Sequence, residues 1–349
     1  MQKEYSDYTI HRRQDKLSIY QQKEKLWWSN ELNRWICTDA ALIKAILANR
    51  QFEVPTYSVE KIIERIPVDL EHNITLVKYF PVALEGEAHK AIRKRHARQL
   101  MLNGDAALES FNLNFTIKLQ ALQDEAGIVF NLHDDLLMPS IQHFFAILLD
   151  IEFSKLSFSD SISQILDETL PLTKRIKINH IIAELINSLP DDLSLDEKYF
   201  RVSMLALGVD SLLGTLTESI VNVLLTHPGQ ALSNMSWPSD ISVTGVPVIE
   251  RILTQPLNLE GQAFQAGQRF RLYLDATGYA DSDEPSYSQL YFGAGRHVCL
   301  GMPIGKKIWS LIAAAFANTH STIQLHDVSR REFDNVFNIY NTIKVSFHD

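Results

Sequence analysis

The chain has 349 residues, of which 46% are hydrophobic and 21% are charged, a composition typical of a folded globular protein. Its formal net charge of −9 argues against a nucleic-acid partner, because such proteins usually carry a strongly basic face. The first residues, 1–20, are polar, and no long uninterrupted apolar run occurs, so we expect no signal peptide, no membrane anchor and a cytoplasmic location.

Helical periodicity covers most of the chain. Apolar residues recur at helical spacing in residues 104–126 and 128–150. The longest such stretch, residues 198–226, predicts a buried central helix. The sequence His-Pro-Gly at 227–229 should end that helix, because proline cannot continue the hydrogen-bond ladder.

The pattern changes after that helix. Residues 243–278 alternate apolar and polar side chains between turn sequences, which predicts a small antiparallel sheet. An acidic connection (281–289), a glycine-rich loop and an amphipathic helix (301–317) follow, and residues 321–349 predict a last hairpin. We therefore expect a single, mainly α-helical domain over residues 1–349, with a minor antiparallel β-sheet region.

The two cysteines, Cys37 and Cys299, lie far apart in the sequence, which argues against a disulfide framework, an iron–sulfur cluster or a multi-cysteine zinc site. Cys299 lies in the glycine-rich loop, Phe-Gly-Ala-Gly-Arg-His-Val-Cys-Leu-Gly at 292–301. Glycines let the backbone approach a flat ligand closely, and the start of the next helix favours a thiolate over a thiol. A thiolate is a good ligand for ferric iron. The alternative for Cys299 is a buried structural cysteine.

This loop resembles the haem-binding loop of cytochromes P450, Phe-Gly-x-Gly-x-(His or Arg)-x-Cys-x-Gly, at every fixed position. The resemblance implies a cytochrome P450 fold that binds haem b (iron protoporphyrin IX), with Cys299 as the axial ligand of the iron. It also implies that His297 offers a donor to a haem propionate. The other loop residues implied in haem binding are Phe292, Gly293, Gly295 and Gly301. Other glycine-loop motifs fail, because Val298 replaces the third glycine of a dinucleotide fingerprint and no Gly-Lys-Ser/Thr follows.

Two further segments resemble parts of P450s that hold the haem propionates. His89 and Arg93 resemble the His-x-x-x-Arg of the C helix, and the i, i+4 spacing puts both side chains on one helix face. The alternative is an ordinary solvated helix face. Arg251 resembles the arginine of the first sheet that pairs with a propionate, and the alternative is an ordinary arginine at a strand edge.

The long predicted helix carries the third resemblance. Residues 207–211, Leu-Gly-Val-Asp-Ser, resemble the oxygen-binding stretch of the P450 I helix. The resemblance implies that Gly208 opens room beside the iron and that Asp210 and Ser211 relay protons. The alternative is an Asp-Ser pair on a solvent-facing stripe. The residues expected to line a substrate pocket are the 54–84 loop, Leu207, Val248 and Ile249.

The sequence departs from the P450 pattern in one respect. Residues 237–245 lack the Glu-x-x-Arg of the K helix, and residues 275–291 contain no arginine that could complete the family's Glu-Arg-Arg network. Because a buried ion pair is costly to break one partner at a time, the loss of all three positions indicates remodelling of this region.

The resemblance implies an oxidoreductase that monooxygenates a small organic metabolite, in secondary metabolism, with O2 and electrons from a ferredoxin- or flavodoxin-type donor. A basic patch for an acidic donor could be formed by Lys90, Arg93, Lys94, Arg95, Arg98, Lys306 and Lys307. The alternative is a set of scattered, solvated cations. Two other functions stay open: a haem-thiolate enzyme with peroxide-driven, dehydrating, isomerising or cyclising chemistry, and a P450-like binding module without catalysis.

Overall fold

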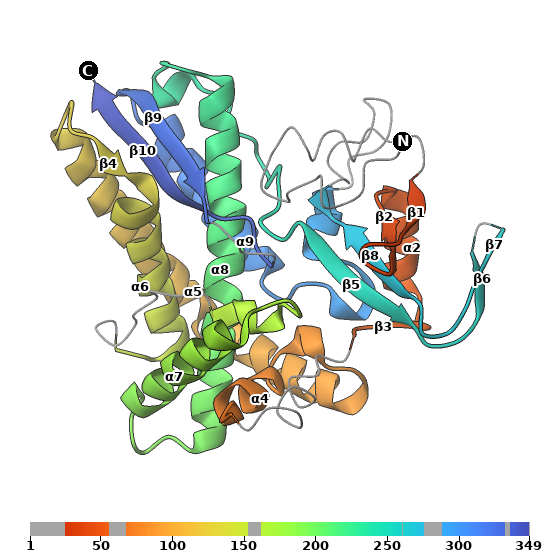
Figure 1. Ribbon diagram of the computed structural model, residues 1–349. Coiled ribbons are helices and arrows are strands. Elements are labelled where there is room, and N and C mark those ends of the chain that lie inside the picture. Colours follow the sequence, from red (N-terminus) through yellow and green to blue (C-terminus); the bar gives the residue numbers. More distant parts are fainter. Residues whose placement is uncertain are drawn as a thin grey trace. The chain divides into compact units, whose positions relative to one another are not determined.

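The computed structural model describes residues 25–55, 68–152, 162–259, 261–275, 288–331 and 336–348. Residue contacts divide the chain into two compact units (Figure 1). The first unit comprises residues 1–56, 81–89 and 246–299, and the second comprises residues 57–80, 90–245 and 300–349. A single domain over residues 1–349 stays a prediction.

The first unit is built on a five-stranded sheet in the order β1-β2-β8-β5-β3. β2 and β8 pair in parallel, and the other neighbours pair antiparallel. The antiparallel strand pairs expected within residues 243–278 are therefore present, and strands from the N-terminal part, one of them parallel, extend the sheet. The strands are β1 (Leu26–Ser29), β2 (Arg34–Cys37), β3 (Phe52–Glu53), β5 (Val248–Leu253) and β8 (Arg269–Tyr273).

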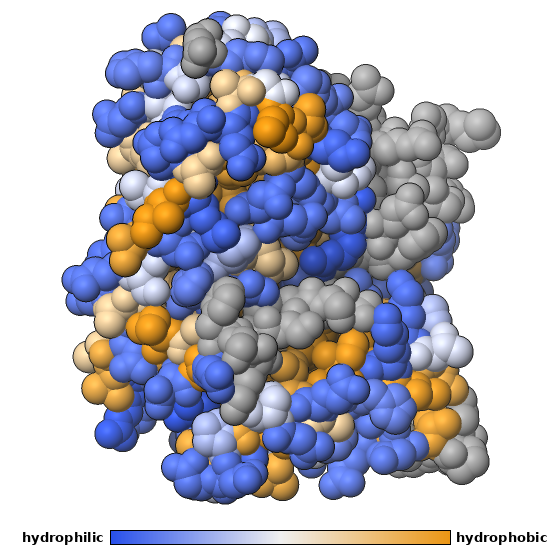
Figure 2. All heavy atoms as spheres, turned by 90° about the vertical axis from the view of Figure 1, so that its left-hand side faces the viewer, coloured by the Kyte–Doolittle hydropathy of each residue, from blue (hydrophilic) through white to orange (hydrophobic). Residues whose placement is uncertain are grey.

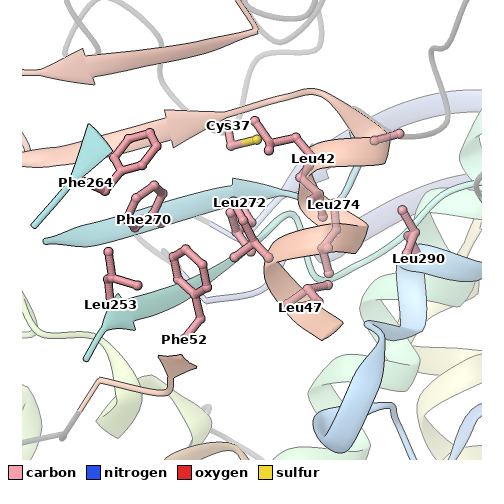
Figure 3. Packing of buried hydrophobic residues seen from close by; sticks show 13 residues of the cluster. Cys37, Leu42, Leu47, Phe52, Leu253, Phe264, Phe270, Leu272, Leu274 and Leu290 are labelled. Carbon is pink, nitrogen blue, oxygen red and sulfur yellow. The ribbon is translucent and has the colours of Figure 1, made fainter. Parts of the chain in front are cut away.

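One face of this sheet packs on helix α2 (Ala40–Ala48), and the apolar core of the unit lies between them (Figure 3). Figure 3 shows Leu272 of β8 beside Leu42 and Leu47 of α2, and Phe270 beside Phe264 and Phe52. The cluster extends to Leu290, which is in the segment just before the cysteine loop. The unit also contains the β6–β7 hairpin (Leu257–Leu259 and Gln262–Phe264) and the 3-10 turns η2 (Pro81–Ala83), η8 (Ser288–Phe292) and η9 (Gly295–His297).

The second unit is mainly helical and has α8 (Leu195–Thr226) at its centre, in contact with α4, α6, α7 and strands β9 and β10 (Figure 1). A three-stranded sheet has the order β4-β10-β9. The other elements are α4 (Glu71–Val77), α5 (Gly86–Asp124, which begins in the first unit), β4 (Phe130–Asn131), the π-helix η3 (Leu132–Leu137), α6 (Met138–Leu149), η5 (Ile162–Leu166), α7 (Leu172–Ser188), η6 (Leu232–Asn234), α9 (Met302–Ala317), β9 (Thr322–Arg330) and β10 (Tyr340–His348).

The structure confirms the predicted central helix, the helix expected over 301–317 and the C-terminal hairpin. The helical stretch expected over 104–126 and the helix face expected for His89 and Arg93 belong to one helix, α5, which begins at Gly86. The expectation of one helix over 128–150 was also wrong. Phe130 pairs with Val345 of β10, and a π-helical turn precedes α6. The predicted acidic connection lies outside the described residues except for its last two.

α8 is the helix, within the described ranges, whose length and apolar composition would allow it to cross a membrane, but 67% of that segment is buried inside the protein. This burial is typical of the core helix of a soluble protein. Figure 2 shows one face of the protein on which hydrophilic side chains predominate and apolar ones form separate small patches, as on most water-exposed surfaces.

Residues 237–245, where the P450 resemblance places the K-helix Glu-x-x-Arg, contain no α-helix, and all of them are described. Their backbone instead packs directly on α8. A Cβ atom at Gly245 would lie 2.3 Å from the carbonyl carbon of Gly214. Gly245 donates its N–H to Thr215 Oγ1 (3.2 Å) and accepts a hydrogen bond from the Asn338 N–H (2.8 Å). Two glycines therefore let a loop occupy space beside the central helix.

We predict that Gly245→Ala lowers the free energy of unfolding by on the order of 2–3 kcal/mol, because the added methyl group meets backbone atoms that cannot move aside. Chemical denaturation measures the loss. The matched control is Gly104→Ala in α5, where a Cβ would meet only the end of the Ile304 side chain at 3.2 Å. The control should stay within about 1 kcal/mol of the parent, since alanine is the better helix former. An equal loss of unfolding free energy in Gly245→Ala and Gly104→Ala would contradict the close approach of the Gly245 and Gly214 backbones.

Candidate functional site

The loop that carries Cys299 is closed on itself. The Cys299 N–H donates to the Phe292 carbonyl at 2.8 Å. Between them Gly293 (φ +71) and Gly295 (φ +65) adopt the left-handed conformation that side chains rarely tolerate. A Cβ at Gly295 would also lie 2.4 Å from the Leu47 carbonyl oxygen, at the end of α2. Glycine is therefore required at both motif positions by the turn, and at 295 by packing as well.

Cys299 is exposed and is not part of a disulfide, so the alternative of a buried structural cysteine was wrong. The next helix, α9, begins at Met302, as the motif requires. Within the described ranges, no group of three or more His, Cys, Asp or Glu side chains could hold a metal ion. An iron that is already held by a porphyrin needs only one axial side chain on this face, and an exposed cysteine fits that need.

Three basic side chains predicted to meet haem propionates lie together in the first unit. The rings of His89 and His297 have centroids 4.1 Å apart. Burial, then the charges of Arg251 and His89, lower the pKa of His297 to about 4 against the opposing effect of Glu85. The charge of Arg251 therefore acts on His297. The donor groups of these three side chains suit carboxylates, so the loop and this cluster fit a haem with its propionates.

The alternatives for these basic residues were wrong. His89 is only 4% exposed, so it does not lie on a solvated helix face. Arg251 is 7% exposed and belongs to β5, which has a neighbour on each side in the sheet and is not an edge strand. Arg93 is half-buried and lies four residues after His89 in α5, as expected. Phe292 and Gly301 are half-buried.

In the second unit, Asp210 is a buried carboxylate held by two partners. Its Oδ2 accepts from the Ser163 hydroxyl at 2.6 Å, and its Oδ1 accepts from Arg331 Nη1 at 3.0 Å. Asp210 is 6% exposed, so the alternative of a solvent-facing Asp-Ser stripe was wrong for this residue. Buried carboxylates need such partners, and this one obtains them from residues far away in the sequence.

Gly208 and Ser211 are engaged within the same unit. A Cβ at Gly208 would lie 2.4 Å from the Phe145 ring, so this glycine makes room for an aromatic side chain of α6. The Ser211 hydroxyl donates to the Leu207 carbonyl at 2.6 Å, one turn back in α8. Packing against Phe145 thus explains why a glycine is needed at position 208. The roles of Gly208 beside the iron and of Asp210 and Ser211 in proton transfer stay predictions.

Two of the residues expected to line a substrate pocket, Val248 and Ile249, point to opposite faces of their strand. Val248 packs with Ile36 and Tyr273, whereas Ile249 packs in the cluster around α2, because successive strand residues point to opposite faces. Half-buried Leu207 does not line the small cavity of about 20 Å³ in the second unit, which has room for one water molecule. That cavity is lined by Met138, Ile162, Leu205, Ala206, Val209, Asp210 and Arg331. Of the predicted 54–84 loop, residues 56–67 lie outside the described ranges.

The predicted basic patch is smaller than expected, because several of its members are paired with acids. Arg95 bonds to Asp196 at 2.7 Å and to Glu197, and its guanidinium lies 4.1 Å from the centroid of the Phe200 ring. Lys306 pairs with Asp240, and Lys307 pairs with Asp105 at 3.4 Å. Lys90, Lys94 and Arg98 are exposed at i, i+4 and i+8 of α5 and form one basic stripe.

We predict that Arg95→Met lowers the free energy of unfolding by about 1–2 kcal/mol, because it removes two ion pairs and a cation–π contact. Urea denaturation measures the loss. Arg98→Met, on the exposed stripe of the same helix, should change stability by less than about 0.5 kcal/mol. An Arg95→Met variant with an unchanged free energy of unfolding would show that these contacts of Arg95 do not stabilise the fold.

Two residues of these clusters were not predicted from the sequence. Glu85 bonds to Arg296 and His297 of the cysteine loop, and Arg331 bonds to Asp210. Glu85 lies one helical turn before His89, which is the only local signal that could have suggested it. Nothing in the local sequence of Arg331 marks its partner.

No protein-family model matches the chain, and no curated protein matches it in sequence. Solved structures do match in fold. Cytochrome P450 CREJ in complex with (4-ethylphenyl) dihydrogen phosphate aligns with a TM-score of 0.74 at 16% identity, covering 98% of each chain. P450BioI in complex with an acyl carrier protein gives 0.71 at 17% identity, covering 99% of this chain and 97% of the other.

A thermophilic cytochrome P450 from Sulfolobus tokodaii gives a TM-score of 0.68 at 15% identity, covering 96% of this chain and 99% of the other. These similarities extend over nearly the whole length of both partners. The chain has the cytochrome P450 fold, mainly α-helical with minor β-sheets.

Proposed function

We propose that the protein is a haem-thiolate enzyme that binds haem b through Cys299 and monooxygenates a small organic metabolite. The observation that carries this proposal is the closed loop of a P450 fold with an exposed cysteine at its end. Haem with a thiolate ligand supplies the activation of dioxygen.

The residues of the first unit would bind and orient the haem. Arg251 and His89 supply donors for the propionates, and His297 adds a ring nitrogen beside them. Glycine at 293 and 295 keeps side chains off the loop, so that a flat ligand can approach the backbone. The chemistry of the site therefore rests on one sulfur and a small set of basic groups.

Asp210 and Ser211 would handle protons in the second unit. Ser211 donates its hydroxyl hydrogen to Leu207, so its oxygen can still accept a hydrogen bond. Asp210 holds hydrogen bonds from Ser163 and Arg331, and it would have to exchange one of them to pass a proton onward. Proton delivery by this pair thus requires a rearrangement of the Asp210 side chain.

The substrate class is proposed only as a small organic molecule. Among the proteins of similar fold, CREJ was solved with an aryl phosphate and P450BioI with an acyl carrier protein that bears hexadec-9Z-enoic acid. Such different ligands on one fold support no narrower choice.

A ferredoxin- or flavodoxin-type donor would supply electrons, and the basic stripe of Lys90, Lys94 and Arg98 is the surface we propose for it. We predict that the double variant Lys94→Glu and Arg98→Glu weakens donor binding on the order of tenfold at low salt, with less effect at high salt. Titration calorimetry at two ionic strengths measures the donor affinity and its dependence on salt. Lys344→Glu, an exposed lysine of β10, is the control. If the parent, the double variant and Lys344→Glu bound the donor with the same affinity, the basic stripe would not be the donor-binding surface.

A second function is favoured by one observation: residues 237–245, all of them described, contain no α-helix. A remodelled Glu-Arg-Arg region suits a haem-thiolate enzyme that needs no electron donor, such as a peroxide-driven or isomerising one. Turnover assays with NAD(P)H and a redox pair, with peroxide, and with neither would separate the two. Turnover with neither would remove the monooxygenase proposal.

The haem itself is tested by the carbonyl spectrum of the reduced protein. We predict a thiolate-type Soret band in the parent and its loss in Cys299→Ala, because no other cysteine is available in this loop. Cys37→Ala is the matched control: Cys37 is buried in the core around α2, so its loss should leave the band unchanged. A parent protein that stays colourless when offered hemin would end the haem-thiolate proposal.

A further inference from the structure

The carboxylate of Glu85 is a centre of hydrogen bonds in the first unit. Its Oε1 accepts from the Val54 N–H at 2.8 Å, from Arg296 Nη2 at 3.0 Å and from His297 Nε2 at 3.1 Å. Its Oε2 accepts from Arg296 Nε at 2.8 Å. One side chain just before α5 therefore joins the end of β3 to the cysteine loop.

The Arg296 guanidinium meets Glu85 with two nitrogens, and its Nη2 also donates to the Phe52 carbonyl at 2.7 Å. A two-point arginine–carboxylate pair fixes orientation as well as distance. The side chains are 30% and 21% exposed, so water competes less for this pair than at an open surface. Arg296 thus anchors the loop to β3 through Glu85.

Glu85 also determines how the His297 ring is held. Burial alone would raise the pKa of Glu85, but hydrogen bonds from Arg296 and Val54, with the nearby His297, lower it below its usual value. An ionised carboxylate only accepts hydrogen bonds, so the proton of the His297 ring must be on Nε2. Among the described residues, no group forms a hydrogen bond to the other ring nitrogen, Nδ1.

We propose that Glu85 is a positioning residue of the candidate haem site. It holds Arg296 and His297 in place before haem binds, so that the loop presents Cys299 in a fixed geometry. This inference rests on the proposed function. Glu85 acts only through the two loop residues to which it is hydrogen-bonded.

The first test is the rate of haem transfer from the loaded protein to apomyoglobin. Glu85→Ala should release haem about tenfold faster or more, as expected when an outer partner of a metal site is lost. Glu85→Gln should be intermediate, because its amide oxygen still accepts hydrogen bonds but carries no charge for Arg296. Two controls separate this effect from general damage: Glu109→Ala on the exposed face of α5, and Arg95→Met, which loses stability elsewhere. Haem release from Glu85→Ala at the rate of Arg95→Met would overturn the proposal.

The second test needs no haem. In the apoprotein labelled with 15N-histidine, the ring shifts of His297 should show the proton on Nε2 in the parent and a mixture of both tautomers in Glu85→Ala. An unchanged tautomer in Glu85→Ala would overturn the proposal. If the parent binds no hemin at all, the proposed function fails, and this measurement still decides whether Glu85 orients His297.

Discussion

The hydrogen bond from the Cys299 N–H to the Phe292 carbonyl is the constraint on which the candidate site depends. It closes a turn that is possible only because Gly293 and Gly295 accept positive φ angles. The turn is then held from outside, at Gly295 by the end of α2 and at Arg296 by Glu85. An exposed sulfur on a mobile loop would be a poor ligand. This loop is instead fixed by contacts at Gly295 and Arg296, a few residues before Cys299.

The charges around the loop follow from the same arrangement. Within the described residues, the first unit brings Arg251, His89 and His297 together and places only the Glu85 carboxylate against His297 and Arg296. Burial, with the charges of Arg251 and His89, lowers the pKa of His297 to about 4, so its ring is neutral at pH 7. The ring of His297 therefore lies between a carboxylate, Glu85, and a second buried imidazole, His89.

The parts predicted from the sequence are those with local signals. The cysteine loop, α8 and α9 have fixed spacing or long apolar periodicity, and the sequence was sufficient to locate them. β1 to β3 were missed because short strands depend on partners far away in the chain. The partners of Asp210 were missed for the same reason. Ion pairs between distant residues leave no pattern in the sequence.

The contact between Gly245 and Gly214 brings two backbones close enough that no side chain fits between them. The N–H of Gly245 donates to Thr215 Oγ1, and its carbonyl accepts from the Asn338 N–H, so both polar groups of this buried residue are satisfied. Residue 245 is therefore held on the central helix by backbone packing and hydrogen bonds, in a stretch (237–245) that is not itself helical.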